Sequence, residues 1–324
     1  MEKDGNVSDT TLSSPPLDLR AAEADRARRA GEKYVPWVLL APTTIILTLV
    51  GFYPLVYSLY ISTTAYKPTQ ATRYQGFVGI DNYAAGIVDG QFLHALGLTA
   101  LFTLASVGIS LVLAIAMSML FSQQRPGFVL LRTIILIPML ITPIAVGIVW
   151  RTMMMPDLGV LNYLLQAVSL PPLLWTGSYE TALASMILVD VWQWTPFMFI
   201  IIFAGVKALP TSPFEAAAID GAGPMRTFFS VTLPMLKPVI VIATLLRLID
   251  AMRTFDTIHL MTRGGPNFAT DVVSVYLQRV NFRFFDLGYG AALSWMTLIV
   301  ILVTVLIFVK LTGFMKLVAL KEDR

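Results

Sequence analysis

The run FLHALGLTALFTLASVGISLVLAIAMSMLF, residues 92–121, is the longest of several apolar stretches in this sequence. A helix needs about 20 mostly apolar residues to cross the hydrocarbon core of a bilayer. This run is long enough, and five further windows qualify: 36–62, 128–150, 181–206, 239–262 and 289–313. The sequence therefore predicts an all-α, polytopic membrane protein with six transmembrane helices.

The composition agrees with a membrane protein. Of the 324 residues, 56% are hydrophobic and 13% are charged, whereas soluble domains carry about 25% charged residues. The chain has no cysteine, and its two histidines, His94 and His259, do not have metal-ligand spacing. We therefore expect no metal site, and the net charge of +3 is too small to indicate nucleic acid as a partner.

The distribution of basic residues predicts the orientation. Fourteen Lys and Arg residues lie in the tails and connections on the side of the N-terminus, against six on the opposite side. Cytoplasmic loops carry the excess of positive charge, so both termini are expected in the cytoplasm. Residues 1–35 are predicted to be a disordered cytoplasmic tail without a signal-peptide core, residues 36–313 the six-helix domain, and residues 314–324 a second cytoplasmic tail.

One cytoplasmic connection, residues 207–238, contains the polar segment SPFEAAAIDGAG at 212–223. Ser212 is predicted to cap a short helix that starts with Pro213, with Glu215 completing a capping box. Gly221 is placed to end that helix in a left-handed conformation. A second helical stretch is expected from Gly223 to about Pro234. Local signals alone also fit a connector that lies on the membrane.

This segment resembles the EAA signature of permease subunits of binding-protein-dependent ABC importers. The likeness rests on Glu215-Ala216-Ala217, Asp220-Gly221-Ala222, Leu233-Pro234 and Pro238. It continues through Phe255-Asp256, Thr262-Arg263-Gly264-Gly265-Pro266 and Asp286 to Ala292, which are similar to the carbohydrate-uptake group that includes the maltose permease MalF. About residues 36–313 are covered, without the large external insertion of the longer maltose form.

The resemblance implies that residues 212–223 are a coupling helix seated on a separate ATPase. The implied ATPase-coupling residues are Glu215, Ala216, Ala217, Asp220 and Gly221. It also implies a second homologous permease, two cytoplasmic ATPase subunits, an external or periplasmic solute-binding protein, and a location in the bacterial cytoplasmic (inner) membrane. No phosphate-binding Gly-x-x-x-x-Gly-Lys-Ser/Thr occurs in the chain. The chain is therefore expected to be no enzyme itself, with ATP and Mg²⁺ bound only by the partner ATPases.

Polar residues inside spans are functional candidates because they are costly there. At helical spacing, one stripe of the fourth span and one of the fifth combine acids, an amide and aromatic rings, which suits a sugar. The resemblance points to the same places. The predicted substrate-pathway residues are Asp190, Gln193, Trp194, Phe197, Arg247, Asp250 and Thr254. The alternative is that Arg247 and Asp250, and likewise Arg253 and Asp256, only form ion pairs within the bundle.

The substrate is expected to be a carbohydrate. The arginines near the pathway slightly favour an acidic oligosaccharide such as alginate, because guanidinium groups pair with carboxylates. A neutral sugar, a polyol or a sugar phosphate is the alternative. An ion-driven secondary transporter is the alternative from another class, although no internal repeat supports it. In the external connection 151–180, a short amphipathic helix at about 158–168 is expected to dock the binding protein or cover the cavity.

Overall fold

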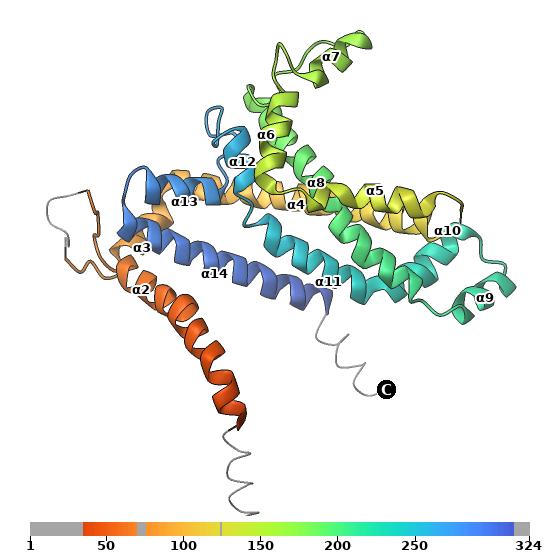
Figure 1. The fold of residues 1–324 in the computed structure, drawn as a ribbon, viewed down its shortest axis with the longest axis horizontal. Coiled ribbons are helices and arrows are strands. Elements are labelled where there is room, and N and C mark those ends of the chain that lie inside the picture. The colour runs from red at the N-terminus through yellow and green to blue at the C-terminus, as the bar shows by residue number, and fades with distance from the viewer. Residues whose placement is uncertain (1–34, 70–75, 124, 314–324) are drawn as a thin grey trace, which may run out of the picture. The chain divides into compact units, whose positions relative to one another are not determined.

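The computed structural model describes residues 35–69, 76–123 and 125–313 (Figure 1). The predicted N-terminal tail, apart from Val35, and the predicted C-terminal tail lie outside the described residues. Within the described ranges the chain is helical, and its only strand-like pairing is an isolated bridge between Thr64 and Phe77. The chain divides into two compact units, one ending at Ser58 and one beginning at Leu59. The predicted all-α class is thus confirmed.

The first span is the helix Val35–Ser62, which contains a π-helical turn, Leu47–Phe52, followed by α2, Tyr53–Ser62. A second π-helical turn, η2 (Phe228–Thr232), occurs in the fifth span. Each turn ends two residues before a proline, Pro54 in the first case and Pro234 in the second. Proline lacks an N–H and crowds the carbonyl one turn earlier, and a widened turn relieves both problems.

The second unit is built from long helices, labelled in Figure 1. They are α4 (Gly90–Ser122), α8 (Tyr179–Lys207), α11 (Leu233–Ala251) and α14 (Leu287–Thr312). The buried side of α4 carries small hydroxyl residues at Thr99, Thr103, Ser106, Ser110 and Ser118. Small residues let membrane helices approach closely, and α4 packs most extensively against α8.

The third predicted span, 128–150, is not one straight helix. It consists of α5 (Phe128–Leu140) and α6 (Pro143–Met153), which are bent by 97° at the intervening break. Ile141 and Thr142 are extended there, because the residue before a proline is sterically pushed out of the helical region. Pro143 then starts the next helix at a position where its missing N–H costs nothing.

The fifth span also differs from the prediction of 239–262. Its helix begins much earlier, at Pro224 with α10 (Pro224–Thr227), runs on through η2 and α11, and ends at Ala251. The expected stop near Pro234 is therefore wrong. After a break, α12 (Asp256–Met261) follows. Four charged residues between positions 247 and 256 were the signal in the sequence that a continuous apolar span could not extend through this segment.

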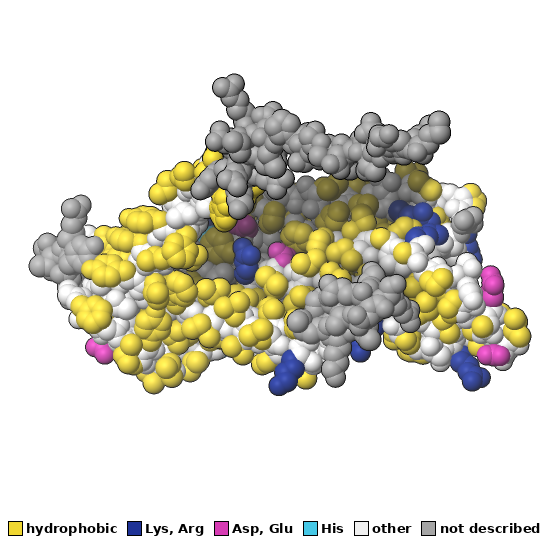
Figure 2. Space-filling view, turned by 90° about the horizontal axis from the view of Figure 1, so that it is seen from below, with side chains coloured by type: hydrophobic (Ala, Val, Ile, Leu, Met, Phe, Trp, Pro, Cys, Tyr) yellow, Lys and Arg dark blue, Asp and Glu magenta, His cyan; other side chains and the backbone are white. Residues whose placement is uncertain are grey.

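Five helices are long and apolar enough to cross a membrane, and the bent pair α5 and α6 makes a sixth candidate. Hydrophobic side chains cover most of the face drawn in Figure 2, as expected for a surface that meets lipid. In the described part of the chain, five short helices lie between the spans: α12 and, in addition, α3 (Asp81–Val88), α7 (Val160–Ala167), α9 (Ser212–Ile219) and α13 (Val273–Phe282). With the bent pair counted as one span, the described residues hold six candidate spans, which is the predicted number.

Candidate functional site

A buried ion pair joins α8 to α11. The Arg247 guanidinium donates from Nη2 to Oδ2 of Asp190, although 57 residues separate the two positions. The Arg247 side chain has no exposed surface, and that of Asp190 is 5% exposed. Sequence spacing suggested no partner for Asp190, because the partner lies on the next span rather than on the same helix.

Asp250 completes a triad with this pair. Its Oδ2 accepts from Nη1 of Arg247 at 3.0 Å, one turn further along α11, and its side chain is 51% exposed. The alternative of an ion pair between Arg247 and Asp250 is thus realised. The corresponding pair of Arg253 with Asp256 is absent from the ion pairs of the described residues. Arg253 lies in the break after α11, and Asp256 is the first residue of α12, so the two residues do not share one helix.

Two aromatic rings of α8 lie beside the triad. The Arg247 guanidinium carbon is 5.7 Å from the centroid of the Trp194 ring, a cation–π arrangement. Trp194 and Phe197 meet edge to face with centroids 6.5 Å apart, and both are partly exposed. The predicted stripe on α8 therefore combines the buried Asp190 with two partly accessible rings.

Gln193 links the same stripe to the break in the third span. Its Nε2 donates to the carbonyl of Ile141 at 3.1 Å, so it satisfies a carbonyl that the bend frees. Its Oε1 is buried and has no hydrogen-bond partner among the described residues. No residue pattern points to Ile141, because its contact with Gln193 uses a backbone carbonyl.

Thr254 is not on a helical stripe, since α11 ends at Ala251. Its hydroxyl lies 3.5 Å from the carbonyl of Asp250, and its own carbonyl accepts from Ser274 Oγ at 2.5 Å. Thr254 thus stays next to the triad through the break, held by α13. Of the seven predicted pathway residues, the triad and the rings lie together, while Gln193 and Thr254 lie at their edges.

The predicted coupling segment forms α9, Ser212–Ile219. The expected capping box is not formed: Thr211 precedes the helix and no side chain caps it. Instead, Phe214 and Glu215 donate their backbone N–H groups to the Thr211 carbonyl.

The end of α9 agrees with the prediction. Gly221 has φ +71°, its N–H donates to the Ala218 carbonyl, and the N–H of Ala222 donates to that of Ala217. This is a Schellman motif. A Cβ at Gly221 would meet no atom within 4 Å, so only the backbone conformation demands glycine here.

The α9 segment presents an exposed surface. Among the five predicted coupling residues, only Ala217 is buried. Ile219, Met225 and Phe229 add apolar surface next to the others, with exposed fractions of 86%, 70% and 58%. Such a patch is typical of an interaction site.

Two basic side chains donate hydrogen bonds to carbonyls at the C-terminal end of α4. Lys207 Nζ donates to the Ser122 carbonyl at 2.7 Å, and Arg132 donates to the Phe121 carbonyl at 2.6 Å. Both also lie over the Phe203 ring, within 5.8 Å of its centroid. They neutralise the negative end of the α4 dipole and so tie the ends of α4, α5 and α8 together next to α9.

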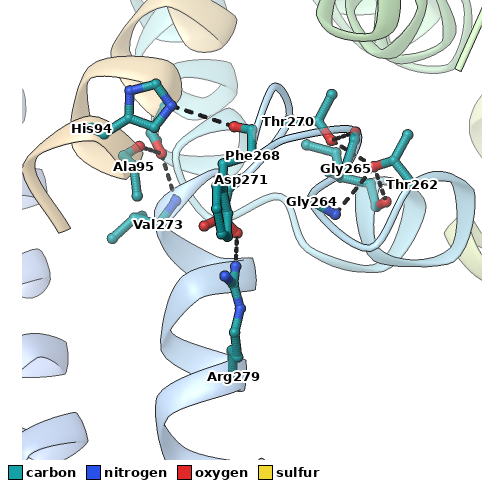
Figure 3. A network of polar contacts seen from close by, with 12 residues as sticks. His94, Ala95, Thr262, Gly264, Gly265, Phe268, Thr270, Asp271, Val273 and Arg279 are labelled. Atoms are coloured by element: carbon teal, nitrogen blue, oxygen red, sulfur yellow. Dashed lines mark hydrogen bonds and ion pairs between the residues drawn. The ribbon is translucent and has the colours of Figure 1, made fainter. Parts of the chain in front are cut away.

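The Gly-Gly-Pro segment is a closely bonded turn (Figure 3). The hydroxyls of Thr262 and Thr270 are 2.7 Å apart, and Thr270 also donates to the Gly265 carbonyl. Gly264 has φ +89°, and a Cβ there would lie 2.8 Å from the Asp271 carboxylate. Burial raises the pKa of Asp271, and the ion pair with Arg279 offsets part of this effect.

A carboxylate at the start of α4 joins three helices, and we call this group of side chains, Asp89, Tyr276 and Tyr289, the Asp89 hub. Asp89 accepts from the hydroxyls of Tyr276 on α13 and Tyr289 on α14, both at 2.6 Å, and caps α4 through the N–H groups of Gln91 and Phe92. Burial alone would raise the pKa of Asp89, but these hydrogen bonds outweigh it and lower the pKa. Sequence reasoning missed this hub, because the three side chains come from distant segments.

The connection 151–180, which is predicted to be external, forms the expected short helix, α7. Its polar Asn162 is buried and binds the Pro156 and Leu173 carbonyls, the Leu173 N–H and Trp175 Nε1. The apolar Tyr163 and Leu164 face outward instead. The described residues contain no group of three or more His, Cys, Asp or Glu that could hold a metal ion.

The fold and these sites define a multi-pass membrane transport subunit. The chain belongs to the family of binding-protein-dependent transport system inner membrane components, whose profile matches residues 106–322. It is thus an inner-membrane permease subunit of an ABC transporter and not an ATPase. This membership decides against the ion-driven alternative.

Individual relatives are similar over most of the chain. The sulfoquinovosyl glycerol transport system permease SmoG of Agrobacterium fabrum is 35% identical, over 82% of this chain and 85% of that protein. The trehalose/maltose transport system permease MalF of Thermococcus litoralis is 31% identical, over 87% and 95%. A crystal structure of a bacterial ABC transporter that imports the acidic polysaccharide alginate aligns with a TM-score of 0.77 at 20% identity, covering 89% of this chain and 98% of that one, which shows the shared fold.

Proposed function

We propose that this chain is the permease subunit of an ATP-driven carbohydrate importer and lines half of its translocation pathway. The observation that carries this proposal is the position of the triad of Asp190, Arg247 and Asp250 beside the Trp194 and Phe197 rings. Sugars pack their C–H faces on rings and bond their hydroxyls to carboxylates. The names of SmoG and MalF, which refer to sugar-containing substrates, support the same class.

The same two helices connect the pathway to the coupling segment. Asp190 lies on α8, which precedes α9 in the chain. Arg247 lies on α11, which follows α9. A displacement of α9 would therefore reach both sides of the triad through continuous helices. We propose that Glu215, Ala216, Ala217, Asp220 and Gly221 form the coupling contact with a cytoplasmic ATPase.

The complete transporter would contain a second homologous permease, two ATPase subunits that bind ATP and Mg²⁺, and a solute-binding protein. Both termini of this chain would be cytoplasmic, with residues 1–35 and 314–324 as tails of the permease domain 36–313 and residues 207–238 as the coupling loop. The exposed apolar side chains of Ile219, at the end of α9, and of Met225, at the start of the next helix, support a protein partner on that side.

An acidic oligosaccharide is one candidate substrate within this class. Arg253 favours it, because this side chain is exposed and pairs with no carboxylate among the described residues. A neutral sugar or polyol is the other candidate.

The test is to purify the chain with its partners and measure ATP hydrolysis with the cognate binding protein and a panel of neutral and acidic saccharides. We expect at least one saccharide to stimulate hydrolysis and to enter proteoliposomes. The absence of any co-purifying ATPase would overturn the proposal.

A further inference from the structure

The triad of Asp190, Arg247 and Asp250 contains two carboxylates and one guanidinium. Both terminal nitrogens of Arg247 already bind a carboxylate, Nη2 that of Asp190 and Nη1 that of Asp250. The guanidinium carbon lies over the Trp194 ring, 5.7 Å from its centroid, and no part of the side chain is exposed. A substrate anion therefore has no access to Arg247, one of the arginines near the pathway that favoured an acidic substrate.

Asp250 is the accessible member of the triad. Half of its side chain is exposed, while Asp190 is almost completely buried. Its Oδ2 is bonded to Arg247, and no described residue donates a hydrogen bond to its Oδ1, which is therefore available as an acceptor. Since the buried pair neutralises itself, the group that faces the pathway is a carboxylate whose charge is not fully compensated.

A fixed carboxylate discriminates between substrates by charge. It accepts a hydrogen bond from a sugar hydroxyl, and such charge-assisted bonds are stronger than neutral ones. It repels a carboxylate, sulfonate or phosphate at the same point, and this repulsion is weakly screened away from bulk water.

We infer that Asp250 is a specificity-determining residue that selects a neutral, hydroxyl-bearing sugar unit, and that Arg247 is a positioning residue that holds Asp250 without touching the substrate. This inference rests on the proposed function and chooses between its two candidate substrates. The Trp194 and Phe197 rings supply the apolar contact for the same sugar unit. Asp190 fixes the orientation of Arg247 from the neighbouring helix.

The experiment uses the complete transporter with its binding protein in proteoliposomes. The probes are trehalose and maltose and the same disaccharides oxidised at one C6 to the uronate. We expect the neutral probes to be preferred. Asp250→Asn should raise the KM for neutral probes at least about tenfold, leave the maximal rate nearly unchanged, and reduce discrimination against the uronates.

Two controls separate charge from structure. Asp256→Asn removes an exposed carboxylate from the nearby α12 and should change neither KM nor discrimination. The paired replacement Asp190→Leu with Arg247→Met removes the buried ion pair while keeping similar volume, so the chain should still assemble. In that background Asp250→Asn should raise KM by a smaller factor, because Asp250 is no longer held in place.

Two outcomes would overturn this inference and leave the importer function standing. One is transport of the uronates but not of the neutral probes, and the other is an unchanged KM for the neutral probes in Asp250→Asn. An equal effect of Asp250→Asn in both backgrounds would refute the positioning role of Arg247. Absence of ATP-dependent uptake of any saccharide, with no ATPase in the preparation, would instead refute the proposed function.

Discussion

Asp190 and Arg247 lie 57 positions apart in the sequence and form one buried ion pair between α8 and α11. In the chain, α8 precedes the segment that contains α9 and α11 follows it. The pair thus joins the helices that flank the predicted coupling segment, at the level of the predicted substrate pathway. Its energetics can be tested directly.

Breaking this pair from one side should destabilise the protein. Asp190→Leu leaves the Arg247 charge buried with only the half-exposed Asp250 as a partner, and such a change costs about 3 kcal/mol or more. Thermal unfolding of the purified complex, followed by fluorescence-detected size exclusion, should show a clear loss. The double variant Asp190→Leu with Arg247→Met should regain most of the stability, and a double variant as unstable as the single one would contradict this account.

The bend after α9 should depend on the conformation of one glycine. Gly221→Val places a β-branched residue at φ +71°, which such residues strongly disfavour. We expect uptake to fall at least about tenfold, by displacement of the coupling contact, while membrane insertion is retained. ATP-dependent uptake in proteoliposomes measures the effect.

Gly223→Val is the matched control for this prediction. Gly223 lies two residues later at φ −70°, and a Cβ there would also meet open space. Valine adopts this conformation without strain, so uptake should stay near the wild-type level. Equal uptake by the two variants would show that the left-handed bend is not required.

Gln193 should influence the pathway through the broken third span. Gln193→Ala removes the donor to the Ile141 carbonyl and leaves that group unsatisfied, at a cost of about 1–3 kcal/mol. We expect a raised KM for sugar, measured as uptake at varied substrate concentration. Gln166→Ala, at an exposed position of α7, is the control and should have no effect; unchanged kinetics in Gln193→Ala would remove this residue from the site.

The Asp89 hub predicts a pH effect with a defined sign. The pKa of Asp89 is lowered from 3.8 in the folded protein, so its contribution to stability is present above the unfolded pKa and is lost as pH falls through the folded pKa. The unfolding temperature of wild type should therefore drop more steeply below about pH 4 than that of Asp89→Asn. Parallel profiles would contradict the assignment. Tyr276→Phe, which removes one of the two tyrosine bonds, should give an intermediate slope.

Much of the fold followed from local patterns. Apolar runs of sufficient length predicted six spans, because the bilayer imposes a minimum length on each crossing helix. The sequence EAAAIDG predicted a helix with a left-handed end, because Gly221 adopts positive φ without steric cost. The capping box at Ser212 was wrong, since the chain satisfies the first N–H groups with the Thr211 carbonyl instead.

The two breaks show where local patterns failed. Ile141 and Thr142 interrupt the third span, and residues 252–255 interrupt the fifth. Hydropathy counts apolar residues over a window and does not register a change of backbone direction. The proline at position 143 and the cluster of charges after position 247 were the only local signs.

The sequence by itself determined the class of fold, the number of apolar segments and the bend after α9, because each depends on the length, hydropathy or backbone preference of one short segment. The tertiary structure alone decided that Asp190 neutralises Arg247, that Asp250 remains accessible and that Gln193 meets the Ile141 carbonyl. Each of these contacts joins segments that only helix packing brings together. The charge presented to a substrate therefore depends on pairing across helices and cannot be obtained from a count of charged residues.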